Sequence, residues 1–315
     1  MSVRQNLLIF RYRYLRLAGL GPGCHQSRRG RPRGRPGGAA EKGSDPHYNA
    51  FDAPADESVT VKGHRALEEE ERIGDYKQPR WTARRRFPTT RVYVAPKGQF
   101  AIEYWLRSTT DLENFSRADA KKYRSIYEIE LGLGHRLQLD LYLTAEQGGH
   151  GPIEVAKESA ELRYALADWG EIWGNPTLYF EYGREGGGGN FAEGKLLLGG
   201  EVTEGLHAGL NLVLEHVLSD DETNEYKITG GLSKTLVDKE FSLGAEVEVE
   251  FVDVKGSRFD FVEKKYVAGP SLSWQPDKSM HLLWTPLLGI AQEKTDDGDE
   301  STVIWQNWIV VGWNY

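Results

Sequence analysis

Residues 99–315 predict an all-β fold, a transmembrane antiparallel up-and-down β-barrel of about twelve strands. Three features of this region carry the prediction. Polar and apolar side chains alternate with a period of two, which is typical of half-buried strands. The alternating segments are roughly ten residues long, the length with which a tilted strand crosses a bilayer. Long polar connections also alternate with short turns, as they do between the two ends of such a barrel.

The first strands show the alternation most simply. In residues 99–107 the even-numbered positions are apolar, whereas Glu103 and Arg107 lie on the opposite face. Residues 126–144 predict a hairpin with its turn at 134–136, because the alternation holds on both sides of that turn. These segments form the predicted start of the sheet.

The pattern then repeats to the C-terminus. Further strands are predicted at 159–167, 176–183, 194–203, 205–217, 225–233, 240–252, 264–274, 279–291 and 302–315. Long connections are predicted at 108–123, 145–158, 184–193, 218–224, 253–263 and 292–301, with shorter turns at 134–136, 168–175, 203–205, 234–239 and 275–278. A soluble carbohydrate-binding β-sandwich also alternates, but it does not explain this loop rhythm.

The region before the strands has a different character. Residues 1–40 carry nine Arg and no acidic residue, which predicts a disordered Arg/Gly/Pro-rich head. We expect this head to be a wrongly assigned start or an aberrant signal region that the mature protein lacks. Residues 41–98 predict a polar periplasmic linker.

The linker ends in a basic segment, residues 78–94. Its arginines are Arg80, Arg84, Arg85, Arg86 and Arg91. One hypothesis is that this segment folds into the periplasmic mouth and partly plugs it by pairing with carboxylates. The alternative is a solvated tether.

The polar face of a barrel lines its lumen. The predicted register places these charged residues inside: Glu103, Arg107, Glu128, Glu130, Asp140, Glu161, Arg163, Glu181, Glu201, Glu215, Glu246, Glu248 and Glu250. Because acidic residues outnumber fixed cations, an open lumen would favour cations. The alternative is a closed lumen in which the charges pair across strands.

The terminal segment "WIVVGWNY" ends on an aromatic residue with apolar side chains at alternate positions before it. In this respect residues 99–315 resemble bacterial outer-membrane β-barrel proteins, with Trp313 and Tyr315 as the assembly signal. "ADWGEIWGNPTLYFEY" and "RRRFPTTRVYV" are also similar to uncharacterised barrels of the phenol-degradation (MetA-pathway) group. The resemblance implies a Gram-negative outer membrane, periplasmic termini, and lipids, the barrel assembly machinery and small solutes as partners. The last strand is expected to pair with the first and close the barrel.

Several classes of function are disfavoured. The acidic body argues against nucleic-acid binding, and one cysteine, Cys24, excludes a disulfide framework. Acidic loops at 219–225 and 295–300 lack a calcium-loop pattern, so no metal site is predicted there. The sequence has no G-x-S-x-G and no HExxH motif, so no catalytic residue is predicted, and no cofactor is expected. A lipid hydrolase built on His216, Ser219 and Asp220 is a minor alternative.

We therefore predict a passive diffusion channel for small solutes, with a cation preference. A closed structural or interaction barrel is the alternative.

Overall fold

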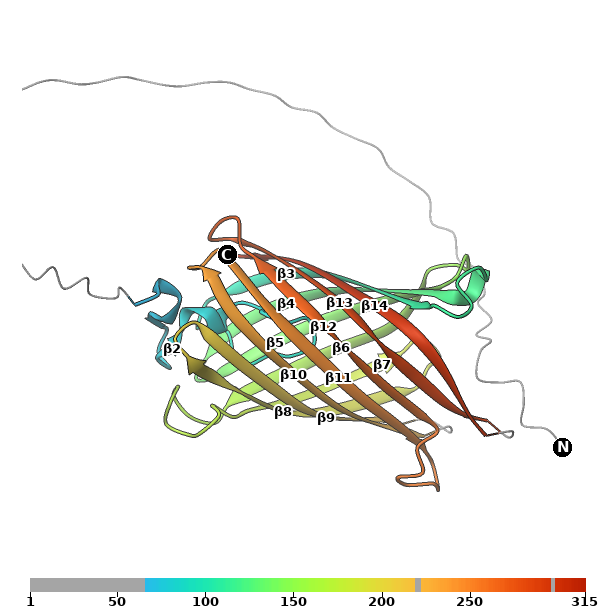
Figure 1. Cartoon of the computed structure of the whole chain (residues 1–315). Helices are drawn as coiled ribbons and strands as arrows, with labels where there is room; N and C mark the ends of the chain where they lie inside the picture. Colours follow the sequence, from blue (N-terminus) through green and yellow to red (C-terminus); the bar gives the residue numbers. More distant parts are fainter. Residues whose placement is uncertain (1–65, 219–221, 296–297) are drawn as a thin grey trace, which may run out of the picture. The chain divides into compact units, whose positions relative to one another are not determined.

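A computed structural model describes residues 66–218, 222–295 and 298–315 (Figure 1). The predicted head and residues 41–65 of the predicted linker lie outside the described residues. Twelve antiparallel strands, β3 to β14, close into a barrel. The predicted fold is thus confirmed. None of the helices in the described ranges is long and apolar enough to cross a membrane.

The barrel strands are 9 to 17 residues long. Their bounds are β3 Phe100–Asp111, β4 Lys121–Gly134, β5 Leu137–Gly148, β6 Glu154–Ala165, β7 Thr177–Glu185, β8 Asn190–Thr203, β9 Leu206–Leu218, β10 Thr223–Val237, β11 Phe241–Val254, β12 Glu263–Trp274, β13 Met280–Thr295 and β14 Gly298–Asn314. Each strand pairs with its neighbours in sequence order, so the topology is up-and-down.

The barrel closes between β14 and β3, as predicted. Trp308 lies opposite Arg107 and Asn314 lies opposite Ala101. The pairing continues to the last residue, because the N–H of Tyr315 donates to the carbonyl of Phe100 at 2.8 Å. The C-terminal end is therefore hydrogen-bonded and leaves no open sheet edge.

The outer wall of the barrel is apolar. Leu212, Phe180 and Leu288 are 41%, 57% and 58% exposed, and they are typical of a belt of large hydrophobic side chains on every strand. Soluble proteins rarely expose contiguous apolar surface on this scale. A lipid environment is the solvent in which such a wall is stable.

The predicted rhythm of long loops and short turns is only partly present, because the β7–β8 and β13–β14 connections, predicted as long, are only 186–189 and 296–297. The long connection predicted at 145–158 is only 149–153, because β5 and β6 continue into the predicted loop. At the other end, the β6–β7 connection at 166–176 is the longest turn. Where a strand projects beyond the bilayer, its outward-facing residues need not be apolar, but its backbone stays paired with the neighbouring strands. The alternation of polar and apolar residues therefore underestimates the length of the strand.

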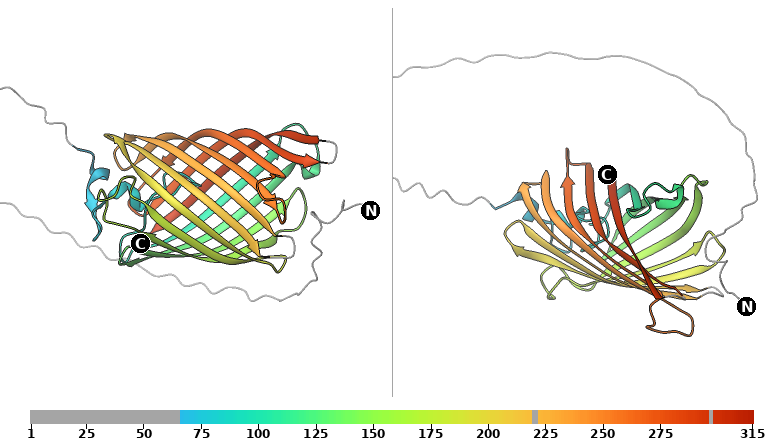
Figure 2. Two further views of the ribbon diagram at one scale, coloured as in Figure 1. Left: turned by 90° about the horizontal axis from the view of Figure 1, so that it is seen from below. Right: turned by 45° about the vertical axis from the view of Figure 1, so that its right-hand side comes forward.

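Four short elements precede the barrel: η1 (Glu68–Glu70), β1 (Arg72–Ile73), β2 (Gln78–Pro79) and η2 (Arg80–Ala83). They lie at the end of the barrel that carries the C-terminus and the short turns, and the chain after η2 runs within the ring of strands (Figures 1 and 2). We call residues 66–98 the lumen segment.

Candidate functional site

Most of the lumen segment after Gln78 is buried by the barrel. Phe87, Tyr93 and Val94 are at most 1% exposed. Burial raises the pKa of the Tyr93 hydroxyl, and this hydroxyl donates to the carbonyl of Ala167 in the β6–β7 turn. A solvated tether would leave these side chains in water.

Arg85 is the centre of the contact between segment and wall. Its guanidinium lies 2.8 Å from Glu103, 3.1 Å from Glu128 and 3.3 Å from Glu130, measured between nitrogen and carboxylate oxygen. It also stacks on the Trp105 ring at 4.1 Å. Burial would lower the pKa of Arg85, but the three carboxylates raise this pKa above its ordinary value. Arg85 is therefore a permanent buried cation.

The other predicted plug arginines have different partners. Arg91 reaches the wall, with Nη2 3.0 Å from a Glu130 oxygen. Arg86 instead pairs at 2.5 Å with Glu69, which belongs to the lumen segment itself.

Arg84 and Arg80 stay near the rim. Arg84 donates to the Gln275 side chain and to the carbonyl of Lys278, both in the β12–β13 turn. Arg80 is half exposed and pairs with Glu71. The predicted pairing with lumen carboxylates is therefore seen for Arg85 and Arg91 and is not seen for these two.

A row of glycines receives the segment. Gly199 pairs with Gly209, and Gly209 pairs with Gly231, so the row crosses β8, β9 and β10 in register. A Cβ atom on these glycines would lie 2.3 Å from Val92, 2.8 Å from Thr90 and 2.6 Å from Phe87, respectively. A side chain at any of these positions would clash with the segment side chain that now lies there, so wall and segment are complementary in shape.

Thr89 and Thr90 are tied to the wall beside the glycine row, since Glu246 on β11 pairs in register with Gly231. The N–H and the hydroxyl of Thr89 donate to Glu246 at 3.2 and 2.6 Å, and the hydroxyl of Thr90 donates to the same carboxylate at 2.9 Å. Asn211 on β9 donates to the Thr89 carbonyl at 3.2 Å. Contacts around the circumference thus hold the segment across the lumen.

Most of the predicted lumen residues do face inward. Those buried on the inner wall are Glu103, Glu128, Glu130, Asp140, Glu161, Arg163, Glu246 and Glu248. Those partly buried on it are Arg107, Glu181, Glu215 and Glu250. Glu201 is exposed at the rim, where it accepts the N–H of Gly205 at 3.2 Å. Its register partner His207 is buried on the inner face, so Glu201 has the predicted inward parity but lies at the end of the barrel, beyond the last pairing of β8 with β7.

Lumen cations that the sequence prediction missed reduce the excess of acid. Lys157 pairs with Glu215 at 2.5 Å, and Lys265 pairs at 2.7 Å with both Glu248 and Glu250. The side chains of Lys157 and Lys265 are 22% and 15% exposed, whereas the Arg85 side chain is 3% exposed. Solvent therefore reaches the lumen from the end of the barrel away from the C-terminus. The lumen segment fills the lumen at the other end.

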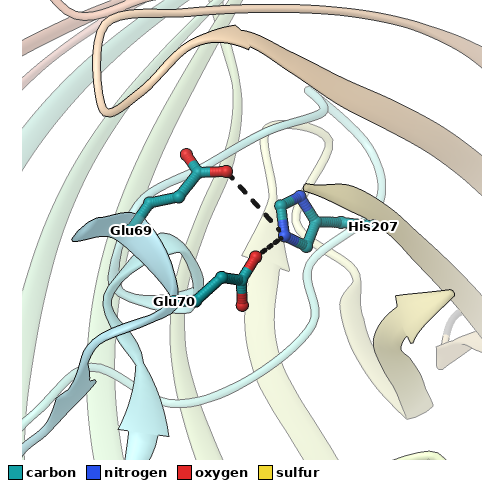
Figure 3. A group of neighbouring side chains, drawn as sticks. All are labelled: Glu69, Glu70 and His207. Atoms are coloured by element: carbon teal, nitrogen blue, oxygen red, sulfur yellow. Dashed lines mark hydrogen bonds and ion pairs between the residues drawn. The ribbon is translucent and has the colours of Figure 1, made fainter. Parts of the chain in front are cut away.

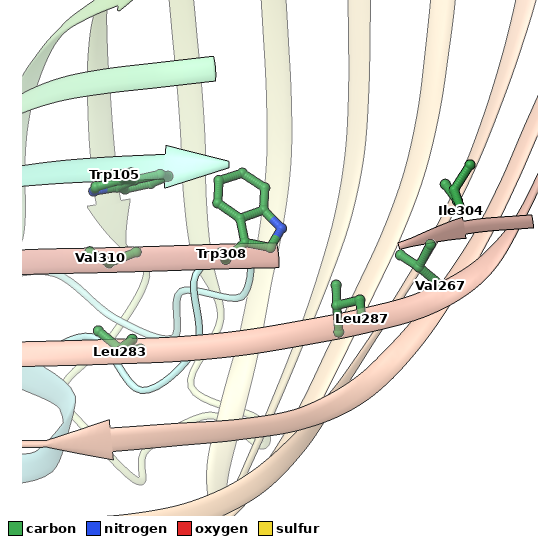
Figure 4. Packing of buried hydrophobic residues seen from close by; sticks show 7 residues of the cluster. All are labelled: Trp105, Val267, Leu283, Leu287, Ile304, Trp308 and Val310. Carbon is green, nitrogen blue, oxygen red and sulfur yellow. The ribbon is translucent and has the colours of Figure 1, made fainter. Parts of the chain in front are cut away.

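One side of the inner wall is apolar (Figure 4). Its cluster consists of Trp105, Val267, Leu283, Leu287, Ile304, Trp308 and Val310. Ile304 and Trp308 face inward, and the Trp308 ring extends from β14 into the lumen (Figure 4). Bulky side chains at the seam narrow the lumen there.

The residues considered for a hydrolase do not form a complete site in the described part of the chain. His216 Nδ1 lies 2.9 Å from the Asn224 side-chain oxygen, and Asn224 donates to Asp253 at 2.7 Å. Ser219 and Asp220 lie outside the described residues. Within the described ranges, no hydroxyl group hydrogen-bonds to His216.

Trp313 and Tyr315, the expected assembly signal, lie on the outer wall. They are 38% and 73% exposed, and the Tyr315 ring lies 5.8 Å from the Phe100 ring. Aromatic side chains at this level suit a membrane–water interface.

Several solved barrels are similar to this chain. An outer membrane channel from Pseudomonas putida F1 has a TM-score of 0.48 and 11% identity, covering 71% of this chain and 98% of the channel. The NanC porin has a TM-score of 0.46 and 10% identity, covering 67% of this chain and 98% of the porin. LpxR from Salmonella typhimurium has a TM-score of 0.39 and 13% identity, covering 66% and 99%. No protein-family model and no curated protein matches the chain.

Proposed function

We propose that the protein is an outer-membrane channel whose lumen segment closes it at rest. The observation that carries the proposal is the fit of this segment: its Arg85 is held by three wall carboxylates, and its Phe87, Thr90 and Val92 lie against the glycine row. The apolar outer wall supports an outer-membrane location. In this arrangement both termini are periplasmic, and assembly requires the barrel assembly machinery.

The solutes are small and pass by diffusion once the segment has moved. Departure of Arg85 and Arg91 would leave Glu103, Glu128 and Glu130 facing the open lumen without these cations. Rings of carboxylates favour cations. The proposed open state is therefore cation-selective.

A disulfide that locks the segment tests the proposal. Val92→Cys with Gly199→Cys places the two sulfurs on neighbouring backbones, because a Cβ on Gly199 would lie 2.3 Å from Val92 Cγ1. Cys24→Ser removes the natural thiol. In planar bilayers we expect the oxidised protein to stay closed, and we expect reduction of the disulfide to allow openings.

Deletion of residues 66–98 is the complementary variant. We expect long-lived openings, and a reversal potential in a KCl gradient that shows preference for K⁺. A deletion variant that is folded in heat-modifiability gels yet remains closed would contradict the channel.

The same experiments address a second candidate, the closed structural barrel. The bulky apolar seam around Trp105 and Trp308 favours it, because these rings also fill part of the lumen. Under this alternative the locked, reduced and deleted forms are all equally impermeable.

A further inference from the structure

Three potential metal ligands meet where the lumen segment enters the barrel (Figure 3). Glu69 and Glu70 belong to η1, and His207 lies at the start of β9. The His207 Nε2 atom is 2.5 Å from a Glu70 oxygen and 3.9 Å from a Glu69 oxygen. One candidate ligand atom from each residue lies within 4.8 Å of the others.

The imidazole is held in one orientation. His207 is fully buried, and its ring packs on Trp81 with the centroids 4.2 Å apart. Figure 3 shows Nε2 directed at both carboxylates, whereas Nδ1 has no hydrogen-bond partner among the described residues. All the polar contacts of the ring are thus made on the side of the two glutamates.

The glutamates are oriented as well. The carboxylate of Glu69 is bonded by Arg86 at 2.5 Å and by the hydroxyl of Thr235. The Asp238 carboxylate accepts the N–H groups of Glu68 and Glu69 at 2.7 and 3.1 Å, which holds η1 against the β10–β11 turn. Such outer contacts are what orient ligands in metal sites.

We propose that Glu69, Glu70 and His207 bind a divalent transition-metal ion of the Zn²⁺ class. One imidazole and two carboxylates suit such ions, whereas Ca²⁺ and Mg²⁺ prefer oxygen ligands alone. Tetrahedral ligands at about 2.1 Å from zinc are about 3.4 Å from one another. That separation lies between the 2.5 and 3.9 Å observed here.

The charge and the exposure of the cluster fit this ion. Two carboxylates face one guanidinium, that of Arg86, so a divalent cation offsets the remaining negative charge. The Glu70 side chain is 17% exposed, which gives the ion an entry path and leaves a position for water.

The site would couple metal to closure. Two ligands move with the lumen segment and the third belongs to the wall, so the full ligand set exists only while the segment is docked. By linkage, metal at 100 times its dissociation constant raises the ratio of docked to undocked segment about 100-fold. This consequence rests on the proposed closure of the channel, whereas the binding itself does not.

Calorimetric titration of the EDTA-treated full chain with ZnCl₂ tests the site. All variants are made in a background protein that carries Cys24→Ser, His25→Ala, His47→Ala and His64→Ala. These changes remove the thiol and the imidazoles that lie outside the described residues. We expect one high-affinity site, weakened at least about 100-fold by His207→Ala. Glu70→Gln should also weaken it, although the amide oxygen can still accept the His207 hydrogen bond. His150→Ala and Glu71→Gln are the matched controls, because His150 is exposed and Glu71 pairs with Arg80.

The outcomes separate the site from the channel. Equal zinc affinity in the background and in both site variants would overturn the metal site, whatever the conductance shows. If zinc binds at His207 but the variant lacking residues 66–98 is still closed, the metal site is supported and the channel is refuted. If both proposals hold, zinc lowers the open probability of the background protein and leaves that of His207→Ala unchanged.

Discussion

Replacement of Arg85 by methionine isolates the electrostatic part of closure. The side chain is nearly as long, so the main change is that Glu103, Glu128 and Glu130 lose a shared buried cation. Removing one partner of a buried ion pair costs about 3–5 kcal/mol. This range corresponds to a shift of about 100- to 4,000-fold in the docking equilibrium, since about 1.4 kcal/mol is a factor of ten.

The structure favours the lower end of that range. Each of the three carboxylates has another donor that Arg85→Met leaves in place. Glu103 accepts the indole N–H of Trp105 at 2.9 Å, Glu128 accepts the Tyr142 hydroxyl at 2.6 Å, and Glu130 accepts a hydrogen bond from Arg91 at 3.0 Å. We therefore expect Arg85→Met to raise the ratio of undocked to docked segment about 100-fold, or about 3 kcal/mol. The ion pair between Arg80 and Glu71 is exposed, so Arg80→Met should change this ratio less than about fivefold.

Single-channel recording measures the ratio as open probability. The oxidised cysteine pair at positions 92 and 199 gives an internal control, because a locked segment should keep Arg85→Met closed until reductant is added. If reduced Arg85→Met, correctly folded, opens no more often than Arg80→Met, the three carboxylates do not hold the segment and the reasoning fails.

Three further predictions concern the wall. Gly231→Val should open the channel, because a clash with Phe87 should destabilise the docked segment by about 1–3 kcal/mol. Gly194→Val is the control and should not open it, since a Cβ there meets no atom within 4 Å. Equal open probabilities of the two variants would contradict the role of the glycine row. In the variant lacking residues 66–98, Glu128→Gln with Glu130→Gln should move the reversal potential toward the unselective value, and an unchanged potential would place selectivity elsewhere. Deletion of Tyr315 should lower the yield of heat-modifiable barrel in outer membranes by disturbing the end of the β14–β3 pairing, and Glu300→Gln near the other end of β14 is the control that should leave the yield unchanged.

The wall of the barrel was predictable because its signal is local. A period of two can be recognised from a few consecutive residues, so the strands could be located one by one. Taken in order around a closed barrel, these strands place β14 next to β3, as observed. Parity gives the face of Glu201 but not its exposure, because parity says which face a residue is on and does not say where the barrel ends. Loop lengths were overestimated for the same reason.

The contacts of the lumen segment could not be derived in the same way. Thr89 meets Glu246 across 157 positions, and His207 meets Glu70 across 137 positions. No periodicity links residues so far apart, so these contacts could not be predicted although each strand was found. One signal was available, namely the glycines at 199, 209 and 231. Inward-facing glycines in register leave room that a solvated lumen does not need.

The acidic lumen is therefore best explained by what fills it. From the sequence, an excess of carboxylates on the inner face indicated permeating cations. In the folded chain the deepest of these carboxylates hold Arg85 and Arg91, while Glu246 holds the N–H and hydroxyl groups of Thr89 and Thr90. Buried carboxylates without partners are costly, so the closed state accounts for their placement without any solute. In the proposed open channel a cation preference would follow from the proposed closure, because the carboxylates that bind the segment are the groups that its departure would expose.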